Sequence, residues 1–155
     1  MAFEVTRRLE ERGLAGPAAL FVSGRRAPSI VVESRVHLLD DAGVLAEMRR
    51  LDGTDARLLL DEEVVRMIMP SIRGDYTAIE TYHCLPPSAT VSCPVEALIG
   101  DNDSRVSVDQ AKAWADHTTA GFGLRVFPGG HFYLIDAAPE IAAHLADRLR
   151  VTPEA

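Results

Sequence analysis

The sequence predicts an α/β fold with a mostly parallel β-sheet flanked by helices, and three observations support this prediction. Short apolar runs that suit strands alternate along the chain with segments that have the apolar spacing of helices. The run AALFVSG is apolar on both faces, as is typical of a parallel strand that helices cover on each side. The chain has 155 residues, 47% hydrophobic and 25% charged, which favours one globular domain with a real core.

The N-terminal segment predicts a helix and then a strand. Phe3, Val5 and Leu9 line one side of the helix, and Gly13 supplies its C-terminal stop. The strand AALFVSG follows. A helix followed by a parallel strand is one step of an α/β unit, and the strand that should precede the helix is missing from the sequence. We therefore expect a single domain over residues 1–155 that is incomplete on its N-terminal side.

The middle of the chain predicts helices. Asp40 or Asp41 caps a helix through AGVLAEMRRL. Residues 58–82 predict two short helices joined near Pro70, rich in Met and Ile and bounded by acidic caps. This hairpin is either plain core or a mobile lid over an apolar pocket, because methionine suits surfaces that repack around different ligands.

The C-terminal half predicts two further steps of strand and helix. The strand VEALI ends at Gly100, and the helix after it, over QAKAWADHT, turns Ala111, Trp114 and Ala115 inward. The strand LRVF ends in a Gly-Gly-His turn, and a closing helix runs from Pro139 to about Leu149. Strands that alternate with helices in this way favour a parallel sheet.

Two predicted strands end in ionisable residues, at the edge where open α/β sheets place their function. Asp101 and Asp103 follow VEALI, and His131 follows LRVF. A carboxylate beside an imidazole fixes its tautomer and stabilises the imidazolium, which is the supporting half of a catalytic triad. We expect Asp103 to pair with His131 and Asp101 to tie down the turn that Gly100 begins. The alternative is that these residues only shape turns or lie in solvent.

The residues around His131 predict the wall of a cavity. His131 follows two glycines and precedes Phe132, Tyr133 and Leu134. A solvated histidine needs no such apolar shell, and a core histidine needs no glycine turn. We expect the glycines to turn the chain sharply at the end of the strand and the apolar residues to wall the cavity behind the ring.

Charge and cysteine content narrow the function classes. The net charge of −7 argues against broad binding to nucleic acid or to an anionic membrane. No segment approaches the roughly 20 apolar residues of a membrane span, and the acidic N-terminal segment does not suit a signal peptide, so we expect a cytoplasmic protein. Cys84 and Cys93 make no disulfide framework, and His83 with Cys84 lacks further metal ligands. We expect no metal and no organic cofactor.

Six segments that span nearly the whole chain carry a family resemblance: AFEVTRRLEERGL, LFVSGRRAPS, VLAEMRRLDGT, MPSIRGDYTAIETY, CPVEALIGDNDSRV and FPGGHFYLID. Together they resemble the type II thioesterases, the editing enzymes of non-ribosomal peptide and polyketide synthesis within the α/β-hydrolase superfamily. The resemblance implies a partial α/β-hydrolase fold with a helical lid inserted at about residues 55–82.

The resemblance also implies an activity and its residues. It implies hydrolysis of acyl groups from the phosphopantetheine arm of an acyl or peptidyl carrier protein, as in antibiotic biosynthesis. Asp103 would be the triad acid and His131 the general base. Met67, Ile68 and Met69 of the lid would contact the acyl chain or the arm.

The sequence departs from the family at the nucleophile. The family's serine stands in a G-x-S-x-G elbow, and this motif does not occur in the chain. We expect its position upstream of Met1, before the helix matched by AFEVTRRLEERG, and the oxyanion-hole donors are missing with it. Ser23, Ser104 and Cys93 are poor replacements, because none of them stands in an elbow.

Two functions from different classes stay open. One is a thioesterase of which this chain holds the acid, the base and the lid, with generic esterase activity as a variant. The other is an inactive remnant or a carrier-protein-binding module. Carrier proteins are acidic, so docking needs a basic patch, for which Arg25-Arg26 and Arg49-Arg50 are candidates if they are more than solvated surface. The unpaired edge of the strand at Leu20–Val22 predicts a homo-oligomer or a partner piece.

Overall fold

The computed structural model describes residues 1–51 and 60–149, and the chain divides into two compact units. The sheet unit comprises Met1–Ile30 and the chain from Leu85 onward, and the helical unit comprises Val31–Cys84. In the described ranges, no helix has the length and apolar character that crossing a membrane requires. The single domain expected over residues 1–155, with its lid at about 55–82, stays a prediction, and residues 55–59 of that lid lie outside the described part.

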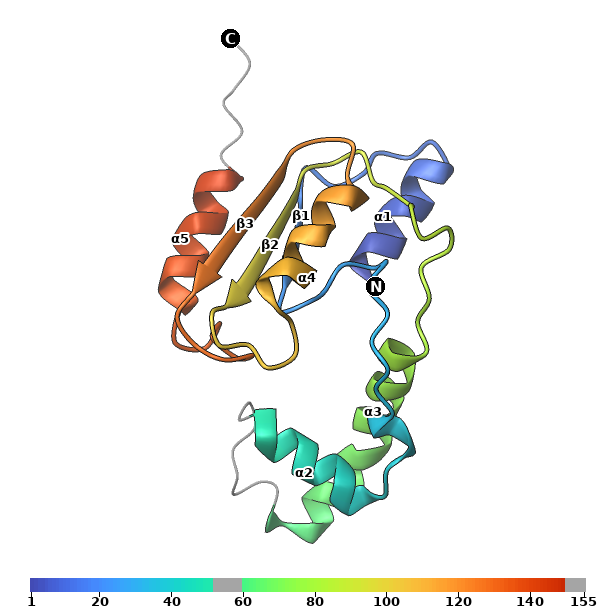
Figure 1. The fold of residues 1–155 in the computed structure, drawn as a ribbon, viewed down its shortest axis with the longest axis vertical. Coiled ribbons are helices and arrows are strands. Elements are labelled where there is room, and N and C mark those ends of the chain that lie inside the picture. Colours follow the sequence, from blue (N-terminus) through green and yellow to red (C-terminus); the bar gives the residue numbers. More distant parts are fainter. Residues whose placement is uncertain (52–59, 150–155) are drawn as a thin grey trace. The chain divides into compact units, whose positions relative to one another are not determined.

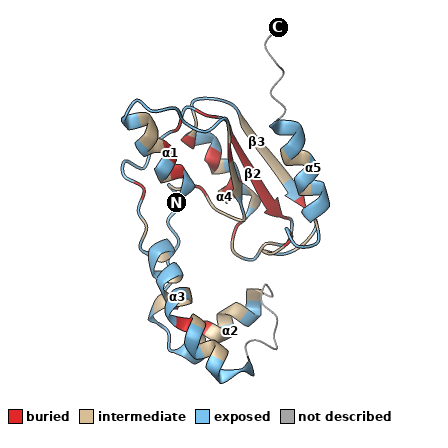
Figure 2. Cartoon of the chain, turned by 180° about the vertical axis from the view of Figure 1, so that it is seen from behind, coloured by how far each residue is buried: buried red, intermediate tan, exposed pale blue. Residues whose placement is uncertain are grey.

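Three parallel strands form the centre of the sheet unit. β1 (Leu20–Ser23) and β3 (Phe122–Phe127) pair on either side of β2 (Val95–Gly100), so the strand order is β1-β2-β3 (Figure 1). Every residue of β2 is buried, and Figure 2 shows this strand in the colour of burial. The predicted parallel α/β sheet is therefore confirmed, with its fully buried strand in the middle.

Helix α1 (Ala2–Glu11) buries a face that differs from the predicted one. Phe3 and Thr6 are buried, whereas Val5 is 52% exposed. Residues three apart lie on the same side of a helix, and residues two apart lie on nearly opposite sides, so a helix that buries Phe3 turns Val5 outward. The Thr6 hydroxyl donates to the carbonyl oxygen of Ala2 at 3.1 Å, which lets this polar side chain be buried.

The segment after β2 also differs in which residues it buries. Helix α4 (Val108–Lys112) continues directly into the 3₁₀ helix η3 (Ala113–His117), and Trp114 and His117 are buried. A 3₁₀ helix has three residues per turn, so Trp114 and His117 share one face and the predicted Ala115 is exposed instead. The Trp114 and His117 rings make edge contacts with Phe3, with centroids at 5.4 and 5.7 Å.

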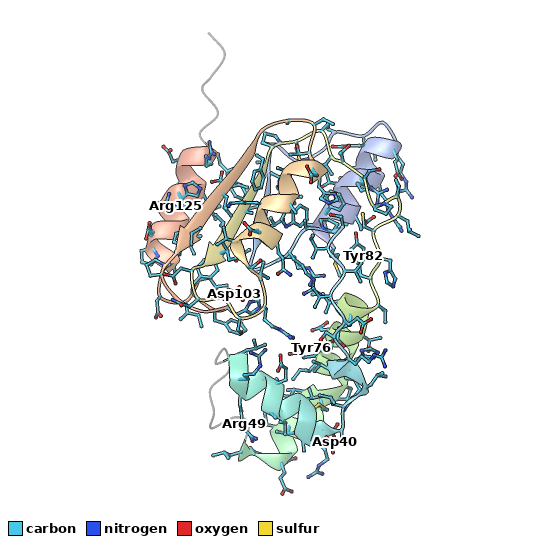
Figure 3. All side chains as sticks on the ribbon, viewed as in Figure 1. Asp40, Arg49, Tyr76, Tyr82, Asp103 and Arg125 are labelled. Atoms are coloured by element: carbon cyan, nitrogen blue, oxygen red, sulfur yellow. The ribbon has the colours of Figure 1, made fainter. Side chains whose placement is uncertain are left out.

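Helix α5 (Ala138–Arg148) is attached to the sheet through a buried carboxylate. Glu96 of β2 is 8% exposed and accepts hydrogen bonds from Nε2 of His144 and from Nε of Arg148. Arg125 of β3, labelled in Figure 3, donates to Nδ1 of His144 at 2.8 Å. The predicted closing helix is confirmed, and this network fixes the helix that follows the His131 loop (residues 128–137).

The helical unit contains one long helix where the sequence predicts two. Helix α3 (Glu62–Glu80) runs without a break through Pro70, so the predicted joint near this residue is wrong. Proline in a helix interior removes one N–H donor and crowds the carbonyl of residue i−4, which costs about 3 kcal/mol. Asp61 caps the helix by accepting from the backbone N–H groups of Glu63 and Val64.

Packing against two other elements compensates the proline in α3. η1 (Val36–Leu38) and α2 (Asp41–Leu51) contribute Val36 and Val44 to a buried cluster that Met69 of α3 completes. Partly buried apolar side chains surround this cluster: Leu45, Met48, Val65, Ile72 and Tyr76. Residues on both sides of Pro70 thus belong to one core, which favours a continuous helix over a hairpin.

A buried carboxylate at the end of α3 holds the segment that contains η1. The side chain of Glu80 is 2% exposed and accepts the backbone N–H groups of Val36 and His37, each at 3.0 Å, the Ser34 hydroxyl and the His37 ring. Burial raises the pKa of Glu80, but these hydrogen bonds outweigh it and bring the pKa from 4.5 to about 2. The ionised carboxylate therefore stabilises the fold.

Acidification is expected to destabilise the helical unit through Glu80. Because its pKa is lower in the folded state, its stabilisation is complete above pH 4.5 and is lost as the pH falls toward 2. At pH 2 the free energy of unfolding should be about 3 kcal/mol lower than at neutral pH, as the size of the Glu80 pKa shift implies. Urea unfolding followed by far-UV circular dichroism from pH 7 to pH 2 measures it.

Glu80→Gln should flatten this part of the pH dependence, because glutamine does not titrate. Glu62→Gln is the matched control, since Glu62 lies exposed on the same helix. Equal pH dependence in the Glu80→Gln variant and the unaltered chain would show that Glu80 does not link folding to protons.

Candidate active site

The structure brings Asp103 and His131 together at the carboxyl edge of the sheet. Asp103 follows β2, where Figure 3 labels it, and His131 follows β3. Nδ1 of His131 lies 2.9 Å from Oδ2 and 3.1 Å from Oδ1 of Asp103. Because β2 and β3 are parallel neighbours, the loops after both strands meet at one edge, as the sequence analysis expects.

The surroundings of Asp103 fix the orientation of the imidazole. The Asp103 side chain is 0% exposed, and Oδ1 also accepts the backbone N–H groups of Arg105 and Val106 at 2.7 and 3.2 Å. A carboxylate that is ionised can only accept, so Nδ1 of His131 carries the proton of the shared hydrogen bond. The lone pair of the ring is then on Nε2. The His131 side chain is 25% exposed, so a substrate has access to it.

Asp101 and Gly100 join the two loops that carry this pair. Oδ1 of Asp101 accepts the backbone N–H of Gly129 at 2.9 Å, and the backbone N–H of Asn102 donates to the carbonyl oxygen of Gly129 at 2.9 Å. A Cβ atom on Gly100 would lie 2.3 Å from the carbonyl oxygen of Gly130. The loops therefore cross at a point where only glycine fits.

The end of β1 lies against the same pair. Gly24 has φ +56°, and a Cβ atom there would lie 3.2 Å from Cε1 of His131 and 3.7 Å from Oδ2 of Asp103. Its backbone N–H donates to the carbonyl oxygen of Leu98 at 2.9 Å, which ties it to β2. The position of Gly24 at the site was not predicted from the sequence. The Ser-Gly pair at the end of an apolar strand was its only signal.

The apolar residues after His131 have three different environments. The Phe132 ring meets the imidazole edge to face, with centroids at 5.3 Å, and Tyr133 is 2% exposed. Leu134 is 43% exposed, so it does not wall a cavity as expected. Burial raises the pKa of the Tyr133 phenol, a hydrogen bond to Ser23 lowers it by less, and the Asp103 charge adds a still smaller increase.

The predicted lid residues do not share one environment. Met67 of α3 is 73% exposed, and Ile68 is half-buried. Met69 is 4% exposed and belongs to the core of the helical unit together with Val36 and Val44. A side chain that fills a core is not available to a ligand in this conformation, so Met67 is the most accessible of the three.

Comparison with known proteins gives a consistent family. The chain is 48% identical over 149 residues to the probable cadicidin biosynthesis thioesterase of Streptomyces griseus, matching 96% of this chain and 41% of that protein. It is 49% identical over 152 residues to thioesterase PikA5 of Streptomyces venezuelae, matching 98% of this chain and 54% of that protein. The chain thus spans about half the length of the curated relatives it matches.

A solved structure supports the same assignment. The type II thioesterase BorB from the borrelidin biosynthetic cluster is 47% identical and superposes with a TM-score of 0.85 over 96% of this chain and 60% of that one. This likeness confirms the α/β-hydrolase fold over the matched part. The model of the thioesterase domain family matches residues 1–149. The resemblance seen in the sequence is therefore confirmed, and the chain belongs to the thioesterase domain family.

Proposed function

We propose that Asp103 and His131 are the acid and the general base of a thioesterase site. The proposed substrate is an acyl group on the phosphopantetheine arm of an acyl or peptidyl carrier protein in polyketide or non-ribosomal peptide synthesis. The observation that carries the proposal is the hydrogen bond between a buried carboxylate and a partly exposed imidazole at the carboxyl edge of a parallel sheet. The names of the relatives support the substrate class.

In this proposal the imidazole moves protons in two steps. Nε2 of His131 takes the proton of a serine hydroxyl as its oxygen attacks the thioester carbonyl, and the imidazolium then gives it to the departing thiolate. The ring next takes a proton from water, whose oxygen attacks the acyl-serine ester, and returns it to the serine oxygen. Asp103 stabilises the imidazolium in both steps. Because G-x-S-x-G does not occur in these 155 residues, the serine belongs to a polypeptide segment outside them.

The lid and partner surfaces are part of the same proposal. Met67 and Ile68 contact the acyl chain or the arm, and Met69 supports them from the core. Carrier docking uses Arg25-Arg26 or Arg49-Arg50, although Arg50 already pairs with Glu47 at 2.8 Å. The proposal also includes a homo-oligomer that forms through the outer edge of β1, since among the described residues β1 pairs only with β2.

The second candidate is a carrier-binding module that does not turn over. The absence of the G-x-S-x-G motif from the sequence favours it, and so does the position of Ser23. The Ser23 hydroxyl lies 2.7 Å from the hydroxyl of Tyr133, so this nearby serine is already engaged.

One assay separates the two candidates. The 155 residues, produced together with the segment that supplies the serine, are mixed with a carrier protein that holds a propionyl thioester, and thioester loss and complex formation are measured together. Turnover that disappears in His131→Ala but persists in His83→Ala supports the thioesterase, because His83 is an exposed histidine of the helical unit. Binding without turnover supports the binding module. If neither binding nor turnover is observed, both candidates are contradicted.

A further inference from the structure

We propose that Ser23 and Tyr133 form a latch that holds the His131 loop against the end of β1 and thereby positions the imidazole on Asp103. The hydroxyl oxygens of the two side chains lie 2.7 Å apart, and 110 residues separate them in the sequence. Ser23 is the last residue of β1, and Tyr133 lies two residues after His131. Both are positioning residues, and the meaning of the latch for catalysis rests on the function proposed above.

One half of the latch is rigid because the Tyr133 ring is locked in place. It stacks on Phe127 with centroids at 5.3 Å and an interplanar angle of 16°, and it packs in a buried cluster with Leu98. Its backbone N–H donates to the carbonyl oxygen of Gly130 at 3.2 Å. A buried ring that stacks on Phe127 has little freedom to move its hydroxyl, so the hydrogen bond to Ser23 fixes the loop rather than following it.

The other half of the latch, Ser23, precedes the residue that lies beside the imidazole. Ser23 is followed by Gly24, whose Cα carries no side chain toward Cε1 and Nδ1 of His131, where a Cβ atom would lie at 3.2 and 3.5 Å. Register pairing with Leu98 and the Gly24 N–H bond to the Leu98 carbonyl hold this strand end on β2. The hydroxyl of Ser23 therefore ties the loop to the same strand end that forms a wall for the ring.

The latch limits which way the imidazole can turn. With the loop fixed on both sides of the ring, Nδ1 stays within 3.1 Å of both carboxylate oxygens of Asp103 and Nε2 faces away from them. Without the latch, the loop keeps its glycine turn at Gly129 and Gly130 but loses its tie to β1. The Nδ1–H tautomer then loses part of its advantage, because that advantage depends on the distance to Asp103.

The experiment measures the tautomer of His131 in this chain and needs no substrate. Long-range proton–nitrogen spectra of the ¹⁵N-histidine-labelled protein give the ratio of the Nδ1–H to the Nε2–H form. Tyr133→Phe keeps the stacked ring and removes only the hydroxyl. We expect Tyr133→Phe and Ser23→Ala each to lower the ratio roughly five-fold, the size expected for one net hydrogen bond.

The double variant and two controls sharpen this test. Since both changes break one bond, the double variant should lower the ratio no further than either single variant. Ser23→Thr keeps a hydroxyl and should preserve the ratio. Ser29→Ala removes a hydrogen bond of 2.8 Å to His117 in the same unit, so it controls for a general loss of stability and should leave His131 unchanged.

Several results would overturn the latch. An unchanged ratio in Tyr133→Phe would do so, and so would additive effects in the double variant or an equal change in Ser29→Ala. If Ser23→Ala fails to fold, the tautomer ratios of Tyr133→Phe and Ser23→Thr still test the latch. A confirmed latch in a chain without thioester turnover would remove only the proposed function, because the tautomer is read without substrate.

Discussion

Asp103→Asn is expected to lower thioester hydrolysis about ten-thousand-fold in any form of the protein that turns over, by analogy with the loss seen when a triad aspartate becomes asparagine. The asparagine amide can donate to Nδ1 of His131, whereas the carboxylate only accepts from it. The imidazole then takes the Nε2–H tautomer, in which Nε2 has no lone pair to receive the serine proton. The backbone N–H groups of Arg105 and Val106 still have an oxygen to bond, so the fold should survive.

The tautomer of His131 makes this prediction measurable without activity. Proton–nitrogen spectra should show the Nδ1–H form in the unaltered chain and the Nε2–H form in Asp103→Asn. Asp101→Asn is the matched control, because Asp101 lies in the same turn and accepts from the backbone of Gly129. A tautomer that stays at Nδ1–H in Asp103→Asn, or a switch in both variants, would contradict the assigned acid.

Gly100→Ala is expected to destabilise the sheet unit by about 3 kcal/mol or more, a loss typical of severe overpacking. The new Cβ atom would lie 2.3 Å from the carbonyl oxygen of Gly130 and 2.4 Å from that of Gly129. Both atoms are backbone, so no side chain can rotate to make room. Gly129 accepts a hydrogen bond from the backbone N–H of Asn102 and donates one to the Asp101 carboxylate, and these bonds hold the two loops together at this point. The clash should therefore also displace His131 from Asp103.

Gly130→Ala provides the control for this prediction. No atom lies within 4 Å of a Cβ at Gly130, and its φ is not in the left-handed region, so alanine there should change stability little. Urea unfolding can be followed by the fluorescence of the single tryptophan, Trp114, which is buried in the sheet unit. Equal stability of the two alanine variants would show that the loops can separate at low cost.

The parts of the fold that depend on local pattern were predictable from the sequence. The strands around Leu20, Val95 and Phe122 were visible as short apolar runs. Of these, β2 is buried throughout, as expected for a parallel strand covered on both faces. The meeting of Asp103 with His131 followed from the ends of two neighbouring strands. Topology alone brings such residues together.

The parts that depend on tertiary packing were not predictable in the same way. The helix through Pro70 persists because side chains on both of its sides share a core, and no local signal reveals that core. The contact of Ser23 with Tyr133 joins residues far apart in sequence, and no local pattern links them. The burial of Glu80 is also tertiary, since its partners come from the chain before α2.

The division of the chain has a consequence for the order in which it folds. β1 pairs with β2, yet the whole helical unit, Val31–Cys84, lies between them in the sequence. During synthesis, Leu20 leaves the ribosome long before Val95, so β1 waits for β2 while the helical unit forms from contacts within its own segment. The sheet closes only once β2 has been made. Pairing of β1 with β2 is therefore a slow, non-local step, and until it occurs the edge of β1 that faces β2 stays open to other partners.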